Sequence, residues 1–261
     1  DGVIATMLYA KYGRFGVYVL QELFQLVQLK QTQEDVDLIK QMMALLTPQH
    51  PAKFTVGESP DIQFDAGVVD LLLHPQDQAY SVKECLDFVE RNGFHFQGWV
   101  EGFTYTIDYQ VGDGFGLTRK IKELPIREQW QAMELLLGFV TMHTFYICHD
   151  ERPKKDYDVQ FEDDSFLDYI PHRQVQKVTP MDAKNQVPAT IQRHNFPAIP
   201  LDIVQVLLFN QTHGDKTIQE IINLCAQQLS KSPLDVKPAA RDFFEKMWRI
   251  GYMYYQIPEA S

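Results

Sequence analysis

Residues 3–10 read VIATMLYA, and residues 11–21 continue as KYGRFGVYVLQ. The first run is short, apolar and partly β-branched, which is typical of a strand buried in a covered sheet. Beyond the turn that contains Gly13, apolar residues recur at helical spacing as far as residue 29. The sequence therefore predicts a buried strand, a turn and a helix in direct succession. This order is typical of α/β proteins.

Helical spacing continues after this first helix. Residues 34–46 carry apolar side chains on one face, and together with residues 15–29 they predict a helical hairpin. Residues 48–64 are rich in Pro, Gly, Ser and Asp, so we expect a loop there. Asp65 is expected to cap a short helix over residues 66–73.

The sharpest boundary along the chain is a capping box. Ser81 is followed three residues later by Glu84, a spacing at which the two side chains satisfy each other's free backbone N–H groups. We expect a helix over residues 82–92 after it. Residues 94–100 and 103–109 then alternate in polarity, which predicts two strands.

The second half of the chain changes character at an acidic segment. A long helix is predicted over residues 126–147, after which residues 150–168 contain eight Asp and Glu residues with little periodicity. We interpret residues 150–172 as a solvated linker between a first domain, residues 1–149, and a second domain, residues 173–261. We expect Phe161, Phe166 and Tyr169 to tie this linker down in part. The second domain has short strands, three helical stretches and a final aromatic strand, an order that resembles a winged helix.

Composition excludes several classes of protein. The chain has 261 residues, is 45% hydrophobic and carries a formal charge of −11. It has no basic segment, which argues against nucleic-acid binding, and no apolar run of membrane-spanning length. The cysteines are odd in number and widely spaced, which argues against a disulfide framework or a zinc cage and fits a reducing, cytoplasmic compartment. They are Cys85, Cys148 and Cys225.

A glycine-rich string, Gly112-Asp113-Gly114-Phe115-Gly116, invites comparison with a nucleotide-binding or S-adenosylmethionine-binding turn. Such a turn needs a helix directly behind it and a second strand that ends in an acidic residue about 20 residues further on. Residues at that distance fall inside the long predicted helix. We therefore interpret the string as a permissive surface loop.

Two segments concentrate side chains suited to binding and proton transfer. The first is the turn after the first strand, because open α/β sheets keep their ligand crevices at the carboxyl ends of strands. It contains Tyr12, Arg14, Tyr18 and Gln21. These residues are candidates for shaping a crevice, or alternatively a packing cluster at the start of a helix.

The second segment is a proline-bounded turn. His74 and Asp77 lie three residues apart and suit the roles of a base and its orienting carboxylate, or alternatively of a structural hydrogen-bond lock. Tyr80 follows in the same string. His143 falls on the buried stripe of the long predicted helix, where it is either a binding residue or a core residue. His143 and His149 are six residues apart, a spacing that does not favour a metal site.

These segments also carry a resemblance. DGVIATMLYAKYGRFGVYVLQ (residues 1–21) resembles the fifth strand and following loop of bacterial class I S-adenosylmethionine-dependent methyltransferases. DLLLHPQDQAYSV (residues 70–82) resembles the LLHPxDxAY[ST]V segment of the same group, and Asn92-Gly93-Phe94 resembles the entry to its last strands. The similarity covers residues 1–148.

The resemblance implies a fold and a function. The fold is α/β: the carboxyl-terminal part of a Rossmann-like methyltransferase sheet with a helical insertion, plus a small winged-helix-like α+β domain. The function is methyl transfer to a small-molecule or protein acceptor, with S-adenosylmethionine as the cofactor of the full-length enzyme. His74 and Asp77 are then catalytic. The expected acceptor-binding residues are Tyr12, Arg14, Tyr18, Gln21, Tyr80 and His143.

The glycine-rich first turn and the ribose-binding carboxylate that hold the donor in this family are not found in the chain. We therefore expect a fragment that carries acceptor-side residues and binds S-adenosylmethionine weakly or not at all. We also expect the strand at residues 3–10 to be the central or a near-central strand of a sheet that lacks its other edge, and so to expose apolar surface.

The competing hypothesis is a non-catalytic protein-binding, peptide-binding or regulatory module. The helix expected over residues 217–229 contains no Lys or Arg, which argues against DNA as the partner of residues 173–261. That domain is expected either to recognise a protein or peptide or to dock on the catalytic domain.

Overall fold

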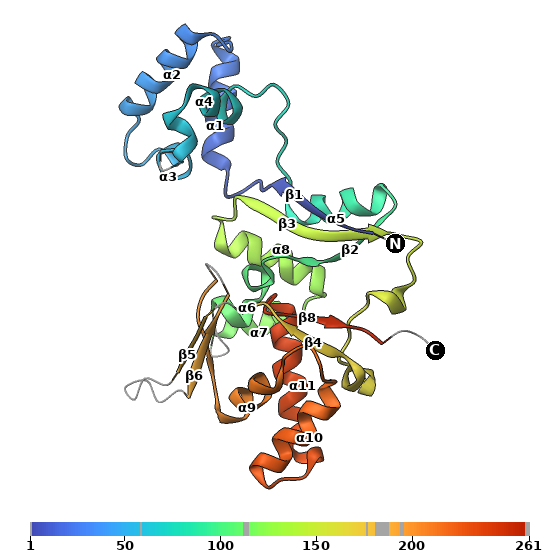
Figure 1. The fold of residues 1–261 in the computed structure, drawn as a ribbon. Coiled ribbons are helices and arrows are strands. Elements are labelled where there is room, and N and C mark those ends of the chain that lie inside the picture. Colours follow the sequence, from blue (N-terminus) through green and yellow to red (C-terminus); the bar gives the residue numbers. More distant parts are fainter. Residues whose placement is uncertain are drawn as a thin grey trace. The chain divides into compact units, whose positions relative to one another are not determined.

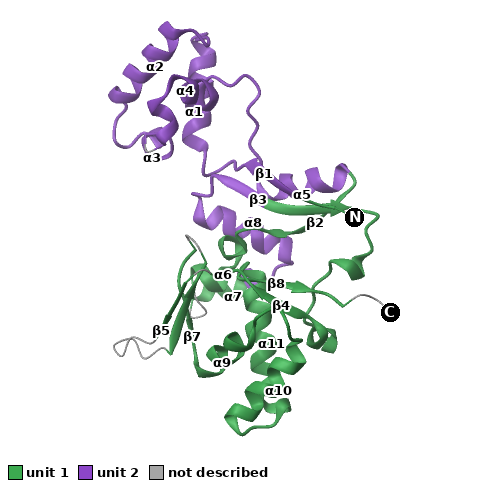
Figure 2. Cartoon of the chain, viewed as in Figure 1, with its two compact units in different colours: residues 1–4, 93–120, 145–261 green, residues 5–92, 121–144 purple. Residues whose placement is uncertain are grey.

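The chain contains two compact units, each assembled from separate segments (Figures 1 and 2). The structure is a computed structural model that describes residues 2–57, 59–111, 115–175, 177–180, 188–193 and 196–258. Unit 1 comprises residues 1–4, 93–120 and 145–261, and unit 2 comprises residues 5–92 and 121–144. The mixture of strands and helices agrees with the predicted α/β class.

The strands β1, β2 and β3 form a sheet with the order β1-β3-β2. β2 pairs with β3 in antiparallel orientation, from Phe94 opposite His149 to Trp99 opposite Phe145. The register shifts between Phe96 and Gly98, so β2 has a bulge there. The bounds are β1 (Val3–Tyr9), β2 (Phe94–Trp99) and β3 (Met142–His149).

The predicted first strand exists, but its predicted burial is wrong. Val3, Ile4 and Met7 are 53%, 48% and 46% exposed. The reason is topological: β1 lies at the edge of its three-stranded sheet, and in the described part of the chain only β3 flanks it there. The described sheet thus ends at β1, and the expected exposure of its apolar residues is observed.

A group of helices in unit 2 encloses its own apolar core. α1 packs on α3 and α4, and α2 packs on α4, so the predicted hairpin of the first two helices is replaced by a four-helix cluster. The segment predicted as loop contains α3 and η1, and Phe64 rather than Asp65 is the residue before α4. The bounds are α1 (Phe15–Leu26), α2 (Gln33–Leu45), α3 (Pro51–Thr55), η1 (Pro60–Gln63) and α4 (Asp65–Leu72).

The predicted capping box is confirmed at the start of α5 (Val82–Arg91). The Ser81 hydroxyl oxygen accepts from the Glu84 N–H, and the Glu84 carboxylate accepts from the Ser81 N–H at 2.7 Å. The helix ends at Asn92, and Gly93 follows with φ of 73°. Local side-chain chemistry was sufficient to place both ends of this helix.

Replacing Ser81 by alanine is expected to lower the free energy of unfolding by about 1 kcal/mol, because the Glu84 N–H loses its hydroxyl acceptor. Urea denaturation monitored by circular dichroism measures this loss, and Ser81→Thr, which keeps the hydroxyl, serves as the control.

The Ser81 N–H also lowers the pKa of Glu84. The ionised Glu84 therefore stabilises the folded protein at pH values above its pKa in the unfolded chain. This stabilisation is lost as the pH falls through the lower pKa that Glu84 has in the folded protein. A stability profile that stays flat in this acidic range contradicts this contact.

Two predicted elements of the first half are wrong. Residues 103–109 form η2 (Gly102–Tyr105) and α6 (Ile107–Gln110) instead of a strand. The long helix predicted over residues 126–147 ends early: α8 (Ile126–Leu137) stops at Gly138, which has φ of 65°, and the chain then enters β3. The β-branched and aromatic residues after Gly138 favour a strand once β2 provides a partner.

The glycine-rich string lies mostly outside the described residues, which exclude residues 112–114. The described part shows that α7 (Gly116–Lys122) begins at the last glycine of the string. The element before the string is α6, not a strand. A strand-turn-helix phosphate loop is therefore still not formed there.

Unit 1 has a separate core built around three helices. α10 and α9 pack against α11, and β4 pairs with β8 in antiparallel orientation. A second sheet has the order β5-β6-β7. The helices are α9 (Ile203–Gln211), α10 (Ile218–Leu229) and α11 (Pro233–Arg249). The strands are β4 (Ile170–Arg173), β5 (Lys177–Pro180), β6 (Ala189–Gln192), β7 (Ile199–Leu201) and β8 (Met253–Gln256).

The acidic segment is held to the core of unit 1 by its aromatic residues, as predicted, while its acidic residues are exposed. It contains η3 (Lys154–Asp156) and η4 (Asp164–Asp168), and its aromatic residues Phe161, Phe166 and Tyr169 are buried in the core of unit 1. The predicted division at residues 150–172 therefore does not coincide with the division into compact units. The physical reason is that residues 93–120 share their contacts with the segment after residue 145.

Candidate functional site

The site predicted from the sequence lies within unit 2, where β1 leads into α1. The turn between them is held tightly by residues of the loop before β3. The Ala10 N–H donates to the Thr141 carbonyl at 3.0 Å, and a Cβ built on Gly13 lies 2.0 Å from the Val140 carbonyl oxygen. Only glycine fits at position 13, so the path of the chain from β1 into α1 is fixed.

Arg14 is the centre of a buried polar cluster that begins at this turn. Its Nη2 atom lies 2.9 Å from Asp77 Oδ2, and the two side chains are 10% and 6% exposed. Its Nε–H donates to the Tyr18 hydroxyl oxygen at 3.1 Å. The guanidinium carbon lies 3.6 Å from the centroid of the Tyr9 ring, a cation–π contact. We call Tyr9, Arg14, Tyr18, Gln21 and Asp77 the Arg14 cluster.

Gln21 completes the cluster from one turn further along α1. Its Nε2 group donates to Asp77 Oδ2 at 3.1 Å and to the Leu71 carbonyl at 3.0 Å. Asp77 thus accepts from a guanidinium and from an amide, and it ties α1 to the segment of residues 73–81. We call this segment the strap.

The predicted base and orienting carboxylate are not paired in the structure. No hydrogen bond joins His74 to Asp77 in the part of the chain that is described, since Asp77 is engaged by Arg14 and Gln21. His74 is exposed, and its Nδ1 accepts from the Gln76 N–H at 3.2 Å. Because Nδ1 accepts this bond, the ring carries a hydrogen on Nε2, which can donate. In this arrangement His74 offers a hydrogen bond rather than a free basic nitrogen.

Tyr80 joins the other end of the strap to β1. Its N–H donates to the Tyr9 carbonyl at 2.8 Å, and its carbonyl accepts from the Lys11 N–H at 3.1 Å. These two bonds form a parallel bridge between Ala10 and Tyr80. The Tyr80 ring packs edge-on against Phe88 of α5, with the ring centroids 5.9 Å apart.

His143 lies on β3, not on a helix, and is fully buried. Its Nε2 atom is 3.0 Å from the Tyr80 carbonyl oxygen and 3.0 Å from Glu134 Oε1. The predicted role of His143 in touching an acceptor does not fit this burial. His143 instead contacts the strap at the Tyr80 carbonyl, on the buried side of the strap.

The predicted residues differ in accessibility. Tyr12 is 39% exposed, His74 is exposed, and Tyr18 is half-buried. Burial raises the pKa of Tyr18, and the nearby Arg14 guanidinium opposes this only in part. Tyr18 is therefore a neutral hydroxyl at physiological pH, able to donate a hydrogen bond while it accepts one from Arg14.

Sequence reasoning missed Tyr9 and Glu134. Tyr9 was assigned to the strand, although an aromatic ring at the last position of β1 lies next to the turn that carries Arg14. Glu134 falls within the long predicted helix but outside its predicted buried stripe. Its signal was available in the sequence, because it is a single acidic residue among the apolar side chains of the string AMELLL (residues 132–137).

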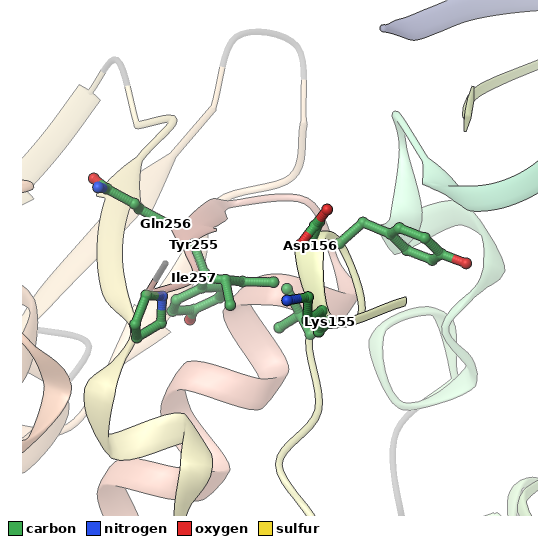
Figure 3. A pocket seen from close by; sticks show the side chains of 8 residues that line it. Lys155, Asp156, Tyr255, Gln256 and Ile257 are labelled. Carbon is green, nitrogen blue, oxygen red and sulfur yellow. The ribbon is translucent and has the colours of Figure 1, made fainter. Parts of the chain in front are cut away.

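Two surface hollows are lined by residues that do not belong to the Arg14 cluster. In unit 1, a pocket of about 380 Å³ is bordered by the end of β8 and by η3, and Lys155, Asp156, Tyr255, Gln256 and Ile257 line it (Figure 3). The Tyr255 hydroxyl donates to the Phe244 carbonyl at 2.7 Å, so it is not available to a ligand. In unit 2, a groove of about 480 Å³ lies between α5 and α8. No predicted site residue lines either hollow.

The described residues contain no group of three His, Cys, Asp or Glu side chains placed to hold a metal ion. Within the same residues, no helix has both the length and the apolar character needed to cross a membrane.

Comparison with known proteins gives a structural likeness. No protein-family model matches the chain. The structure of PKMT2 from Rickettsia typhi matches 98% of this chain with a TM-score of 0.58 and 12% sequence identity. The structure of the same protein in complex with AdoHcy matches 98% with a TM-score of 0.56 and 14% identity. The chain covers 52% of PKMT2 in both cases, so it spans about half the length of these structures. The likeness shows that the chain shares a fold with part of PKMT2.

Proposed function

We propose that this chain forms the acceptor-side half of an S-adenosylmethionine-dependent methyltransferase. The observation that carries the proposal is the fold likeness, which extends over 98% of this chain but over only 52% of PKMT2. PKMT2 is a protein-lysine methyltransferase, and AdoHcy in its second structure is the product that S-adenosylmethionine leaves after methyl transfer. We extend this cofactor to the complete enzyme, with protein lysine as the first acceptor to test.

The described residues do not fit a donor site by themselves. A donor loop needs glycines that leave open space for the ligand. At the β1–α1 turn the corresponding space is filled by the chain itself: a Cβ on Gly13 would meet the Val140 carbonyl oxygen, and a Cβ on Gly16 would meet Thr55 and Ala52. We therefore assign no residue of this chain to S-adenosylmethionine and place the donor in another part of the enzyme.

The exposed face of β1 supports the existence of a further part. Val3, Ile4 and Met7 on this edge strand are about half exposed, which is unusual for three large apolar residues of one short strand. A neighbouring strand with helices on its faces would cover them. Residues 173–261, with their winged-helix-like order, are proposed to serve protein or peptide recognition. The proposed compartment is the cytoplasm.

Within the chain, the accessible residues around the Arg14 cluster are proposed to orient the acceptor. The cluster connects them: Tyr18 is bonded to Arg14, Arg14 to Asp77, and Asp77 lies three residues after His74. Tyr18 and His74 offer hydrogen-bond donors, and the exposed Tyr12 ring offers an aromatic surface. Arg14, Gln21 and Asp77 are buried and act as the frame. The predicted contact of Arg14 and Gln21 with the acceptor, and the predicted role of Asp77 in orienting His74, are revised accordingly.

In the complete gene product, His74→Ala and Tyr18→Phe are each expected to lower kcat/KM for the acceptor by about ten-fold, the usual effect of losing an orienting hydrogen bond. Transfer of a labelled methyl group from S-adenosylmethionine to protein lysines measures this. The affinity for the donor is expected to stay unchanged. His50→Ala, which removes a half-buried histidine that caps α3 in the same unit, is the control. Unchanged kcat/KM in both site variants contradicts the site assignment.

The second candidate is a non-catalytic protein-binding module, and it is favoured by one observation: no predicted site residue lines either of the two hollows described above. The same assay separates the two functions. A complete gene product that binds no S-adenosylmethionine and transfers no methyl group supports the binding module and contradicts the methyltransferase.

A further inference from the structure

We infer that Glu134 and His143 are positioning residues, which hold the strap against the end of β1 and thereby set the orientation of the acceptor-side residues. We call the two residues the buried dyad. The inference rests on the proposed function only in taking the strap as a wall of the acceptor site. The claim that the two residues hold the strap follows from their own hydrogen bonds, independently of that function.

The buried dyad is isolated from solvent. Glu134 on α8 is 1% exposed and His143 on β3 is 0% exposed. Neither side chain can touch an acceptor, so any influence on one must pass through the groups that they contact. Two of those groups are the Tyr80 carbonyl and the Val82 N–H, which lie on either side of Ser81.

The hydrogen positions follow from the partners. The Tyr80 carbonyl only accepts, and it lies 3.0 Å from His143 Nε2, so the hydrogen is on Nε2. Glu134 Oε1, also 3.0 Å from Nε2, shares that hydrogen, and Glu134 Oε2 accepts from the Val82 N–H at 2.8 Å. Val82 is the first residue of α5, where a carboxylate is favoured by the free N–H groups of the helix end.

The dyad therefore fixes the strap at the point where it enters α5. From there the strap is tied outward: Tyr80 is bonded to Tyr9 and Lys11, and Asp77 is bonded to Arg14 and Gln21. The Tyr80 carbonyl accepts from two sides, from the Lys11 N–H and from His143. Removing the dyad leaves the Tyr80 carbonyl with one donor and the Val82 N–H with none.

Two apolar side chains in these positions would avoid the desolvation free energy of burying polar groups. Buried charged and polar groups stabilise a protein only when their hydrogen bonds are satisfied. What an apolar pair cannot do is hold two backbone groups at set positions. The chemistry of the dyad is thus suited to fixing the geometry of the strap.

The test compares Glu134→Ala with a control from the same helix. Met133→Ala is adjacent and equally buried, and it removes packing without removing a bond to the strap. In this chain, amide hydrogen exchange followed by NMR is expected to accelerate at Val82 and Lys11 by ten-fold or more in Glu134→Ala, relative to Met133→Ala. Glu134→Gln, which keeps one oxygen for the Val82 N–H, is expected to restore the protection of Val82.

In the complete gene product, Glu134→Ala is expected to raise the acceptor KM by about ten-fold, to leave donor affinity unchanged, and to be partly rescued by Glu134→Gln. Exchange at Val82 and Lys11 that matches the Met133→Ala control overturns the inference. Faster exchange with an unchanged acceptor KM overturns it as well, because the strap then does not shape the site. If the wild-type protein transfers no methyl group, the proposed function fails, and the exchange measurement alone decides whether the dyad holds the strap.

Discussion

Replacing Arg14 by methionine is expected to lower the free energy of unfolding by about 3–5 kcal/mol, the usual cost of removing one partner from a buried ion pair. The side chains of Arg14 and Asp77 are 10% and 6% exposed, so Asp77 would be left as a buried carboxylate with Gln21 as its remaining donor. The contact of the guanidinium with the Tyr9 ring is lost at the same time. Urea denaturation followed by circular dichroism measures the effect.

Two comparisons make this expectation specific. Asp77→Leu added to Arg14→Met is expected to recover part of the loss, because the buried charge is then gone as well. Lys83→Met removes one partner of an exposed ion pair with Asp87 in the same unit, and its cost is expected to stay below about 1 kcal/mol. A loss below about 1 kcal/mol for Arg14→Met would mean that the Arg14 cluster does not hold α1 to the strap.

Gly13→Ala is expected to cost about 3 kcal/mol or more, because the added Cβ would lie 2.0 Å from the Val140 carbonyl oxygen. The obstructing atom belongs to the backbone, so a side-chain rotation cannot relieve the overlap. Moving the turn would also disturb the bond from Ala10 to Thr141 and the position of Arg14.

The matched control is Gly98→Ala, because a Cβ on Gly98 has no heavy atom within 4 Å. We expect that variant to change stability by less than about 1 kcal/mol. The same denaturation experiment serves both. A Gly13→Ala protein as stable as the Gly98→Ala protein would contradict the close packing of the β1–α1 turn.

The elements that the sequence predicted well are those whose signals are local. The box formed by Ser81 and Glu84 placed the start of α5, and the helical spacing after residue 15 placed α1. The strand β3 was missed because its apolar residues also fit a helical period. The left-handed Gly138 and the pairing with β2 decided between the two, and the pairing is a contact between distant parts of the sequence.

The candidate site was predicted only in part, because residue types are a local signal and the contacts between them are not. Residue types at the turn and in the strap indicated a polar centre, and the structure brings Arg14, Tyr18, Gln21 and Asp77 together. Their roles depend on burial and on partners, which spacing does not reveal. Asp77 is engaged by Arg14 rather than by His74. His143 contacts Glu134 because the folded chain brings β3 next to this part of α8, and the sequence pattern does not reveal that contact.

The measurement that tests the central claim most directly is calorimetric titration of S-adenosylmethionine, with the isolated 261-residue chain and the complete gene product compared in the same buffer. If the chain is the acceptor-side half, the isolated chain shows no saturable binding up to about 1 mM, equivalent to a binding free energy no better than about −4 kcal/mol. The complete gene product binds the donor in the micromolar range. Micromolar binding by the isolated chain would contradict the account, because the donor site would then lie within these residues.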